Sequence, residues 1–206
     1  MQIRKGIVFM NLEKVFREGR WKQTPEFSAA ASAVVYGLLV HSFALNNILH
    51  NHDNIASQPG GYGMGVALGR WFLEFLGIAL DKTGLNYNLP SVNGMIYIAL
   101  LAVTAAYLVS ILKIRRKASA IALGALFVAF PTMIYRYTVI FYGFGVLLAV
   151  LAVWVSGRFR GSLFASAILV ALSMGIYQAY VPLTIALFVL QLILIGCCCF
   201  DSIIRH

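Results

Sequence analysis

The chain has 206 residues, of which 61% are hydrophobic and 11% charged, with a formal net charge of +9. Soluble domains average about 45–50% apolar and about 25% charged residues, so this composition excludes an ordinary soluble domain and indicates a protein of the lipid bilayer. The basic excess does not indicate a nucleic-acid partner, because no basic face with interleaved aromatic residues lies outside the apolar runs. In membrane proteins, lysine and arginine instead collect in cytoplasmic loops.

The first apolar run begins near Phe27, behind a mixed-charge segment. It is too long for the apolar core of a cleavable signal peptide, so we expect it to act as an uncleaved signal anchor. Further apolar runs follow, and we expect about six helices that cross the roughly 30 Å core of a bilayer. They are placed at residues 27–46, 93–112, 118–134, 137–155, 163–179 and 181–200. Pro131 can break or kink the third span, and Pro182 stands near the first turn of the sixth, where a missing N–H costs least.

Positive charges assign the loops to the two sides of the membrane. If the N-terminus is cytoplasmic, only Arg70, Lys82 and Arg136 of the 16 lysine and arginine residues lie outside. The positive-inside rule therefore favours this orientation. The expected organisation is a cytoplasmic N-terminal segment at 1–26, a polytopic membrane domain at 27–200 with an outer loop at 47–92, and a cytoplasmic tail at 201–206.

Residues 64–80, MGVALGRWFLEFLGIAL, are expected to form a helix that lies in the outer interface rather than a seventh span. Arg70 and Glu74 near the middle would be expensive in the bilayer, since arginine alone costs about 2.5–3.5 kcal/mol at a helix centre. A seventh span would also move the KIRRK block at 113–117 to the outside. Arg70, Glu74 and Asp81 instead follow one polar stripe on an apolar cylinder, which is typical of a surface helix.

The outer loop gathers polar side chains in NILHNHDNIASQPGGYGMGVALGRW, at 47–71. Asp53 follows the first span closely, so we expect it near the membrane surface, where a carboxylate can act as a general base on a hydroxyl group. A solvated loop or an Asx-type turn is the plainer interpretation of the same residues. His50 and His52 could bind a metal together with Asp53, but their i, i+2 spacing specifies little.

Arg70 has two alternative partners at the outer interface. Its guanidinium can bind a lipid phosphate bidentately, or it can pair with Glu74 one helical turn later. His41, inside the first span, is either a functional ionisable group or a neutral, hydrogen-bonded histidine. Nearby aromatic residues are typical of an interfacial belt, although some could stack on a sugar. They are Trp71, Tyr62, Tyr135, Tyr137, Tyr142, Tyr177 and Tyr180.

Three segments together resemble one known family: NHDN in the early outer loop, GYGMGVALGRW after it, and SMGIYQAYVPL much later. They resemble the membrane glucosyltransferases of bacteriophage-type serotype conversion, the Gtr II-like family, and the YQAY turn is the most distinctive match. The resemblance runs from about residue 30 to residue 195 and covers the N-terminal part of the family only. Family members are longer, so we expect this chain to be a truncated or split form.

The resemblance implies a GT-C type fold and a glycosyltransferase that depends on a polyprenyl-phosphate sugar. It would move a hexose, typically glucose, with inversion from the polyprenyl-phosphate carrier to a cell-surface polysaccharide such as O-antigen. Asp53 takes the position of the family's first-loop acid and would deprotonate the acceptor hydroxyl. Arg70 would neutralise charge on the departing phosphate. Further substrate-binding candidates are Arg136, Tyr177, Gln178 and Asn54.

The implied partners are the lipid-linked sugar donor, the polysaccharide acceptor and the bilayer, and none is a nucleic acid. No cofactor is assigned, and a divalent metal is left open. Two other functions also stay open. The chain could be a non-catalytic or truncated membrane subunit, or it could transport the lipid-linked sugar, in which case His41 is the strongest candidate residue within a span.

Overall fold

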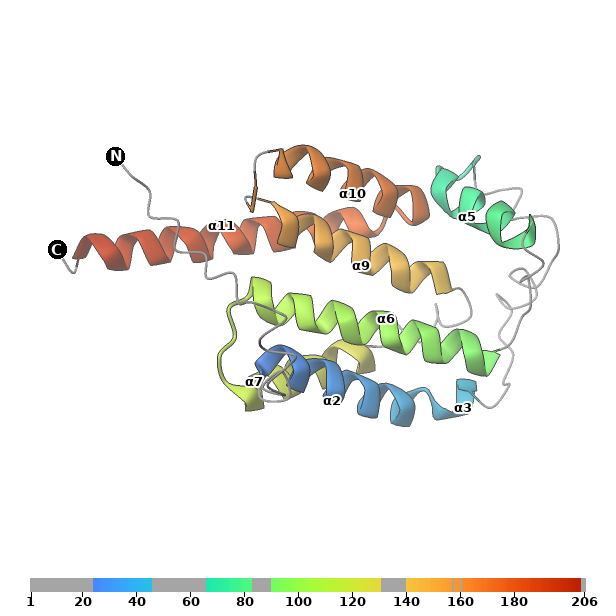
Figure 1. Ribbon diagram of the computed structural model, residues 1–206, viewed down its shortest axis with the longest axis horizontal. Coiled ribbons are helices and arrows are strands. Elements are labelled where there is room, and N and C mark those ends of the chain that lie inside the picture. Colours follow the sequence, from blue (N-terminus) through green and yellow to red (C-terminus); the bar gives the residue numbers. More distant parts are fainter. Residues whose placement is uncertain are drawn as a thin grey trace.

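The computed structural model describes residues 24–45, 66–82, 90–130, 140–156, 158–159 and 161–204. In these ranges every regular element is an α-helix and no strand occurs (Figure 1). The helices are α2 (Pro25–Val40), α3 (Ser42–Leu45), α5 (Trp71–Lys82), α6 (Pro90–Ile111), α7 (Lys117–Ala129), α9 (Ile140–Val155), α10 (Ser162–Ile176) and α11 (Tyr180–Ile204). The all-helical fold class that the sequence predicts is therefore confirmed.

The helix boundaries follow local chemistry. The side chain of Thr24 caps α2 by accepting a 3.2 Å hydrogen bond from the backbone N–H of Phe27, and Pro25 occupies the first helical position, where its missing N–H is harmless. The residue before Pro131 is disfavoured in helical conformation, and Phe130 is extended, with φ −64° and ψ 127°. For this reason α7 ends at Ala129, earlier than the expected residue 134.

The first expected span is divided at His41, where α2 ends and α3 begins. The His41 side chain is fully buried. Its Nε2 lies 3.1 Å from the carbonyl oxygen of Val128 on α7. This contact favours the interpretation of His41 as a hydrogen-bonded residue of the packed interior. Its burial also ties the C-terminal end of α2 to α7.

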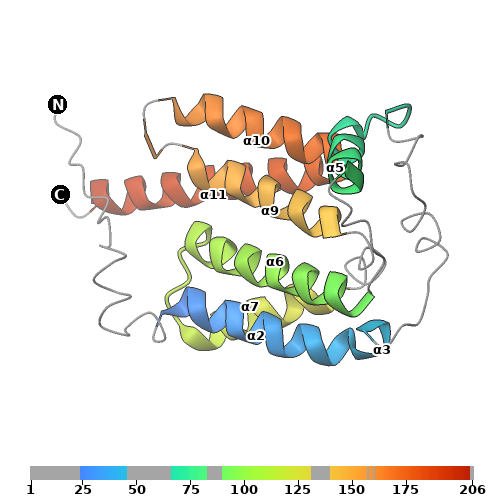
Figure 2. The same ribbon diagram turned by 45° about the vertical axis from the view of Figure 1, so that its right-hand side comes forward.

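The helices form two groups that α6 and α9 join (Figure 1). In one group, α2, α6 and α7 pack around buried residues that include Tyr97, Ile98 and Leu101. In the other, α9, α10 and α11 pack with α5 around residues that include Val146 and Ile176. Figure 2 shows α5 standing across the end of α10 instead of running along the bundle, and the two helices are in contact. This arrangement leaves α5 at one end of the bundle.

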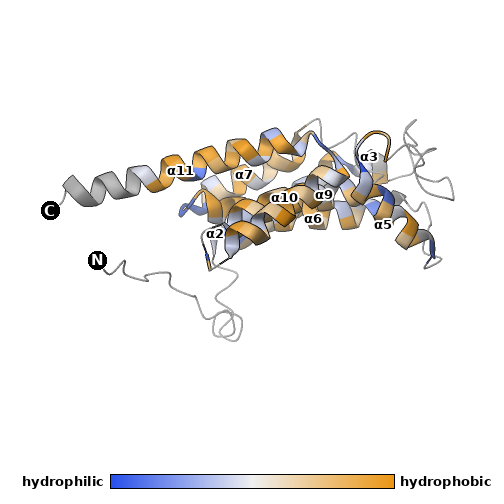
Figure 3. Ribbon diagram, turned by 90° about the horizontal axis from the view of Figure 1, so that it is seen from above, coloured by the Kyte–Doolittle hydropathy of each residue, from blue (hydrophilic) through white to orange (hydrophobic). Residues whose placement is uncertain are grey.

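The exterior of the bundle is apolar. Figure 3 shows that hydrophobic residues make up most of the helices, and many of them are exposed on the outside. Leu126 is 73% exposed, and Leu163 and Phe164 are each 74% exposed. Among the described helices, Ser91–Ile111 is long and apolar enough to cross a membrane, and the other apolar helices have 10–17 residues. Large exposed apolar patches are rare on soluble monomers, so this exterior supports the membrane placement that we propose below.

Candidate functional site

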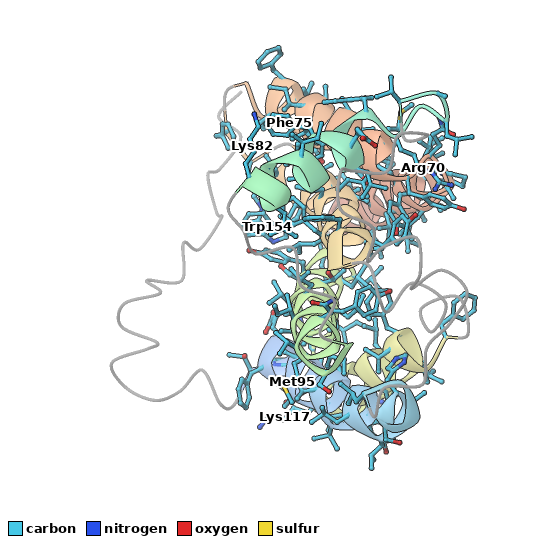
Figure 4. The ribbon with its side chains drawn as sticks, turned by 90° about the vertical axis from the view of Figure 1, so that its right-hand side faces the viewer. Arg70, Phe75, Lys82, Met95, Lys117 and Trp154 are labelled. Carbon is cyan, nitrogen blue, oxygen red and sulfur yellow. The ribbon has the colours of Figure 1, made fainter. Side chains whose placement is uncertain are left out.

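The candidate site is built around Arg70, the residue that immediately precedes α5. Figure 4 views the bundle from the end at which α5 lies and shows Arg70 beside α9, α10 and α11, with Phe75 and Lys82 farther along α5. The Arg70 side chain is half-buried. The start of α5 therefore places a cation at the end of the second helix group at which α9 begins and α10 ends.

Two tyrosines from other elements contact the Arg70 guanidinium. Its Nη1 donates a 3.3 Å hydrogen bond to the hydroxyl oxygen of Tyr142, in the first turn of α9. Its Cζ lies 4.8 Å from the ring centroid of Tyr177, which follows α10 directly. A cation above an aromatic face is attracted by the electron-rich ring. The guanidinium is therefore held from two sides by uncharged groups.

These tyrosines belong to a tyrosine cluster that we define as Tyr142, Tyr177 and Tyr180. The rings of Tyr142 and Tyr177 meet edge to face with centroids 5.6 Å apart. The rings of Tyr177 and Tyr180 are also 5.6 Å apart and meet edge to face. The hydroxyl of Tyr180 donates a 3.0 Å hydrogen bond to the backbone carbonyl of Tyr142. The cluster thus connects α9, the α10–α11 turn and α11 beneath Arg70.

The segment before α5 is attached to the same turn. The amide Nε2 of Gln178 donates a 3.0 Å hydrogen bond to the backbone carbonyl of Leu68. Between Leu68 and Arg70, Gly69 has a left-handed φ of +74°, and a Cβ at this position would overlap the Gln178 amide. Glycine is the residue that accepts both the conformation and the close approach without strain. The backbone immediately before Arg70 is therefore fixed by Gln178.

The start of α5 also requires a glycine on α10. A Cβ added to Gly175 would lie 2.7 Å from Cε2 of Trp71 and 2.8 Å from Cβ of Phe72. Such distances are well inside van der Waals contact, so the two helices approach closely only because position 175 has no side chain. This contact sets how α5, and with it Arg70, sits on the bundle.

Arg70 does not pair with Glu74 in the part of the chain that the structure describes. The Glu74 backbone N–H donates the helical hydrogen bond to the Arg70 carbonyl, at 3.1 Å. The guanidinium contacts Tyr142 and Tyr177 instead. Because phenol groups are neutral, these contacts leave the positive charge of Arg70 uncompensated by any described carboxylate. Of the two alternatives that the sequence offers for Arg70, this geometry favours an anion-binding role.

The structure brings together three of the candidates that the sequence singled out, namely Arg70, Tyr177 and Gln178. The other three, Asp53, Asn54 and Arg136, lie outside the described residues, and their roles stay predictions. So does the metal site considered for the HNHDN stretch, which is also outside them. Within the described ranges, no group of three or more His, Cys, Asp or Glu side chains is placed to hold a metal ion.

Tyr142 is a site residue that the sequence analysis placed among the aromatic residues typical of an interfacial belt, some of which could stack on a sugar. Its sequence context, FYGFG at the start of an apolar run, carries no sign of a contact with Arg70. The single available signal is its position in the first turn of an apolar helix. That position is shared by other aromatic residues, so the signal does not single out Tyr142.

A family model described as glucosyl transferase GtrII matches residues 42–197, which is well over half of the chain. The chain belongs to this family. The match contains Arg70, the tyrosine cluster and Gln178, and it confirms the family that the motifs predicted. This glucosyl transferase has no match among the curated proteins or the solved structures. The family establishes transfer of a glucosyl group, with a sugar donor and an acceptor, as the general activity.

Proposed function

We propose that this glucosyl transferase moves glucose from a polyprenyl-phosphate carrier to a cell-surface polysaccharide at the outer face of the bacterial inner membrane. The observation that carries the proposal is the environment of Arg70, a half-buried cation held by neutral tyrosines at one end of an apolar bundle. The apolar exterior and the apolar sequence runs support placement of this bundle in the bilayer, with its N-terminus cytoplasmic. The charged head of a lipid-linked donor would then meet Arg70 at the outer interface.

Arg70 suits a departing phosphate. A guanidinium has five N–H donors in a planar fork that matches phosphate oxygens, and one of them contacts Tyr142. The residue also precedes the first turn of α5, whose backbone N–H groups and helix dipole favour an anion. Partial burial strengthens such electrostatic interactions because the surrounding dielectric is low. Arg70 would therefore stabilise the negative charge that grows on the phosphate as the sugar leaves.

The proposed base, Asp53, belongs to the segment 46–65 between α3 and the turn before α5, which lies outside the described residues. Leu45 ends α3, and Ser91 at the start of α6 donates a 2.7 Å hydrogen bond to its carbonyl oxygen. This contact fixes the start of the loop at the end of the bundle that carries α5 (Figure 1). Asp53 follows Leu45 by eight residues, which reach at most about 28 Å. Asp53 is therefore within about 28 Å of Leu45, at the end of the bundle that carries α5.

The reaction would be a single displacement. Asp53 accepts the proton of an acceptor hydroxyl, the hydroxyl oxygen bonds to the anomeric carbon, and the bond between that carbon and the phosphate oxygen breaks. The electron pair leaves with polyprenyl phosphate, and the anomeric centre is inverted. Arg136, Tyr177, Gln178 and Asn54 are proposed to contribute to substrate binding. The ends of α7 and α9 that flank Arg136 lie at the same end of the bundle as α5 (Figure 1).

The test is hexose transfer from polyprenyl-phosphate glucose to endogenous glycan, measured in membranes that contain the wild-type chain or a variant. Loss of a general base costs about 10²–10⁴-fold, so Asp53→Asn is expected to lower transfer at least about 10²-fold. The matched control is Asp81→Asn, which removes another outer aspartate with no proposed role and should leave transfer unchanged. Full activity of Asp53→Asn would refute the assignment of the base. Absence of transfer by the wild-type chain would contradict the proposal that this chain carries the activity.

A further inference from the structure

The polar groups of the YQAY turn, residues 177–180, all act on Arg70 or on the groups next to it. The Tyr177 ring lies under the guanidinium. The Gln178 amide binds the carbonyl of Leu68, two residues before Arg70. The Tyr180 hydroxyl binds the backbone of Tyr142, whose own hydroxyl accepts from Arg70. Tyr142 of α9 and Tyr177 of the turn therefore contact the Arg70 side chain. Gln178 and Tyr180 hold the residues beside it.

We infer that Tyr142 and Gln178 are positioning residues that hold Arg70 for the transferred phosphate. This inference rests on the proposed role of Arg70 in the reaction. Tyr142 acts directly, through its hydrogen bond to the guanidinium. Gln178 acts through the backbone, because its amide fixes the carbonyl of Leu68 and, by close contact at Gly69, the turn that leads into Arg70.

The chemistry of these partners suits positioning without neutralisation. An arginine side chain is long and loses considerable rotamer freedom when it is held in one geometry. A carboxylate partner would hold it, but it would also cancel the charge and compete with the phosphate. A phenol hydroxyl and a tyrosine ring hold the guanidinium while its charge is kept. The site thereby avoids reorganisation when negative charge develops, which is the condition for effective electrostatic catalysis.

The tyrosine cluster is itself packed closely enough to keep these partners in place. A Cβ added to Gly145 of α9 would lie 2.7 Å from Cε2 of Tyr180. On the facing helix, the buried Ser173 of α10 donates a 2.8 Å hydrogen bond to the Gly145 carbonyl. The backbone of α9 is therefore fixed next to Tyr142 by both α10 and α11. A small change in this contact moves the hydroxyl that meets Arg70.

The test compares Tyr142→Phe and Gln178→Leu with the matched controls Tyr107→Phe and Gln191→Leu. Tyr107 and Gln191 have similar chemistry but contact Trp154 and Ser156, at the other end of α9. The first readout is the rate at which phenylglyoxal modifies Arg70, resolved by peptide mass spectrometry on the full chain. The second is the split between kcat and KM for polyprenyl-phosphate glucose. The first readout requires no catalytic activity.

Tyr142→Phe and Gln178→Leu are expected to raise the Arg70 modification rate several-fold and to lower kcat/KM about tenfold, while the controls change neither quantity. In an Arg70→Lys background, Tyr142→Phe should add little, since its effect passes through the guanidinium. Unchanged modification rates, or faster modification with unchanged kcat/KM, would overturn the inference. If the wild-type chain transfers no sugar, the proposed function and the reaction role fail together. Faster modification in the variants would still support the holding of Arg70.

Discussion

Replacement of Gly175 by alanine tests whether the close approach of α10 and α5 sets the site. A Cβ at this position would lie 2.7 Å from Cε2 of Trp71 and 2.8 Å from Cβ of Phe72. The indole can swing away at modest cost, but the Phe72 Cβ is attached to the α5 backbone. Normal contact near 3.4–4 Å therefore requires α5 to move by roughly 0.6–1 Å. The substitution acts on the placement of a whole helix.

Gly175→Ala is expected to change the free energy of unfolding little and the transfer rate strongly. Alanine in place of glycine favours a helix interior by about 1 kcal/mol, whereas overpacking typically costs about 1–3 kcal/mol. The two effects offset each other in part, so we expect the free energy of unfolding to fall by no more than about 2 kcal/mol. A displacement of about 1 Å near reacting groups can cost about 10²-fold in rate. Gly175→Ala should therefore lose most of its transfer activity while it remains folded.

The matched control is Gly196→Ala on α11, where an added Cβ meets nothing within 4 Å. This variant should retain full transfer and be slightly more stable. The assays are sugar transfer in membranes and thermal unfolding of the purified chain in detergent, followed by size-exclusion chromatography. Gly175→Ala with wild-type transfer would refute the reasoning, because α5 and Arg70 would then tolerate the displacement. An equal loss of transfer activity in Gly196→Ala would show that alanine in a helix lowers activity wherever it is placed.

Two further predictions concern charge and packing. Arg70→Lys keeps the charge but loses the planar fork and the ring contact with Tyr177, so kcat/KM for the donor should fall about tenfold. An unchanged kcat/KM in steady-state transfer assays would contradict the proposed role of Arg70. Gly124→Ala would place a Cβ onto the carbonyl oxygen of Ala29 on α2 and the Ser32 hydroxyl. It should destabilise the chain by about 1–3 kcal/mol, measured as a lower thermal unfolding temperature, and wild-type stability would show that α2 and α7 separate freely.

The sequence predicts the helices well because long apolar runs are a property of each segment alone. The expected span 93–112 and the observed α6, Pro90–Ile111, differ by a few residues. Where the helix boundary expected from the sequence is wrong, the observed boundary depends on a contact with a residue distant in the sequence or on the conformation of a single residue. The helix expected at 64–80 begins only at Trp71, because the preceding turn is closed at Gly69 and held by Gln178. That amide lies more than 100 residues along the chain, so no local pattern contains it.

The contacts of side chains in the site likewise cannot be predicted from local sequence patterns. The sequence identified Arg70 as a candidate and offered Glu74 as a partner, since residues four apart share a helix face. The structure gives it Tyr142, which is 72 residues away in the chain. A tyrosine near the outer end of an apolar helix looks the same in sequence whether it faces lipid or an arginine. Only the packing of α9 against α10 and α11 distinguishes the two cases.

The identity of these partners has a consequence for what the site can bind. Had Glu74 taken the guanidinium, the pair would be close to neutral, and an arriving phosphate would have to displace a carboxylate. With Tyr142 and Tyr177 as partners, the positive charge stays available in a half-buried place. Holding a charge that no described carboxylate compensates costs free energy in the empty protein, and an anionic ligand would recover that cost. The neutral surroundings of Arg70 are therefore those expected where the counterion is the substrate.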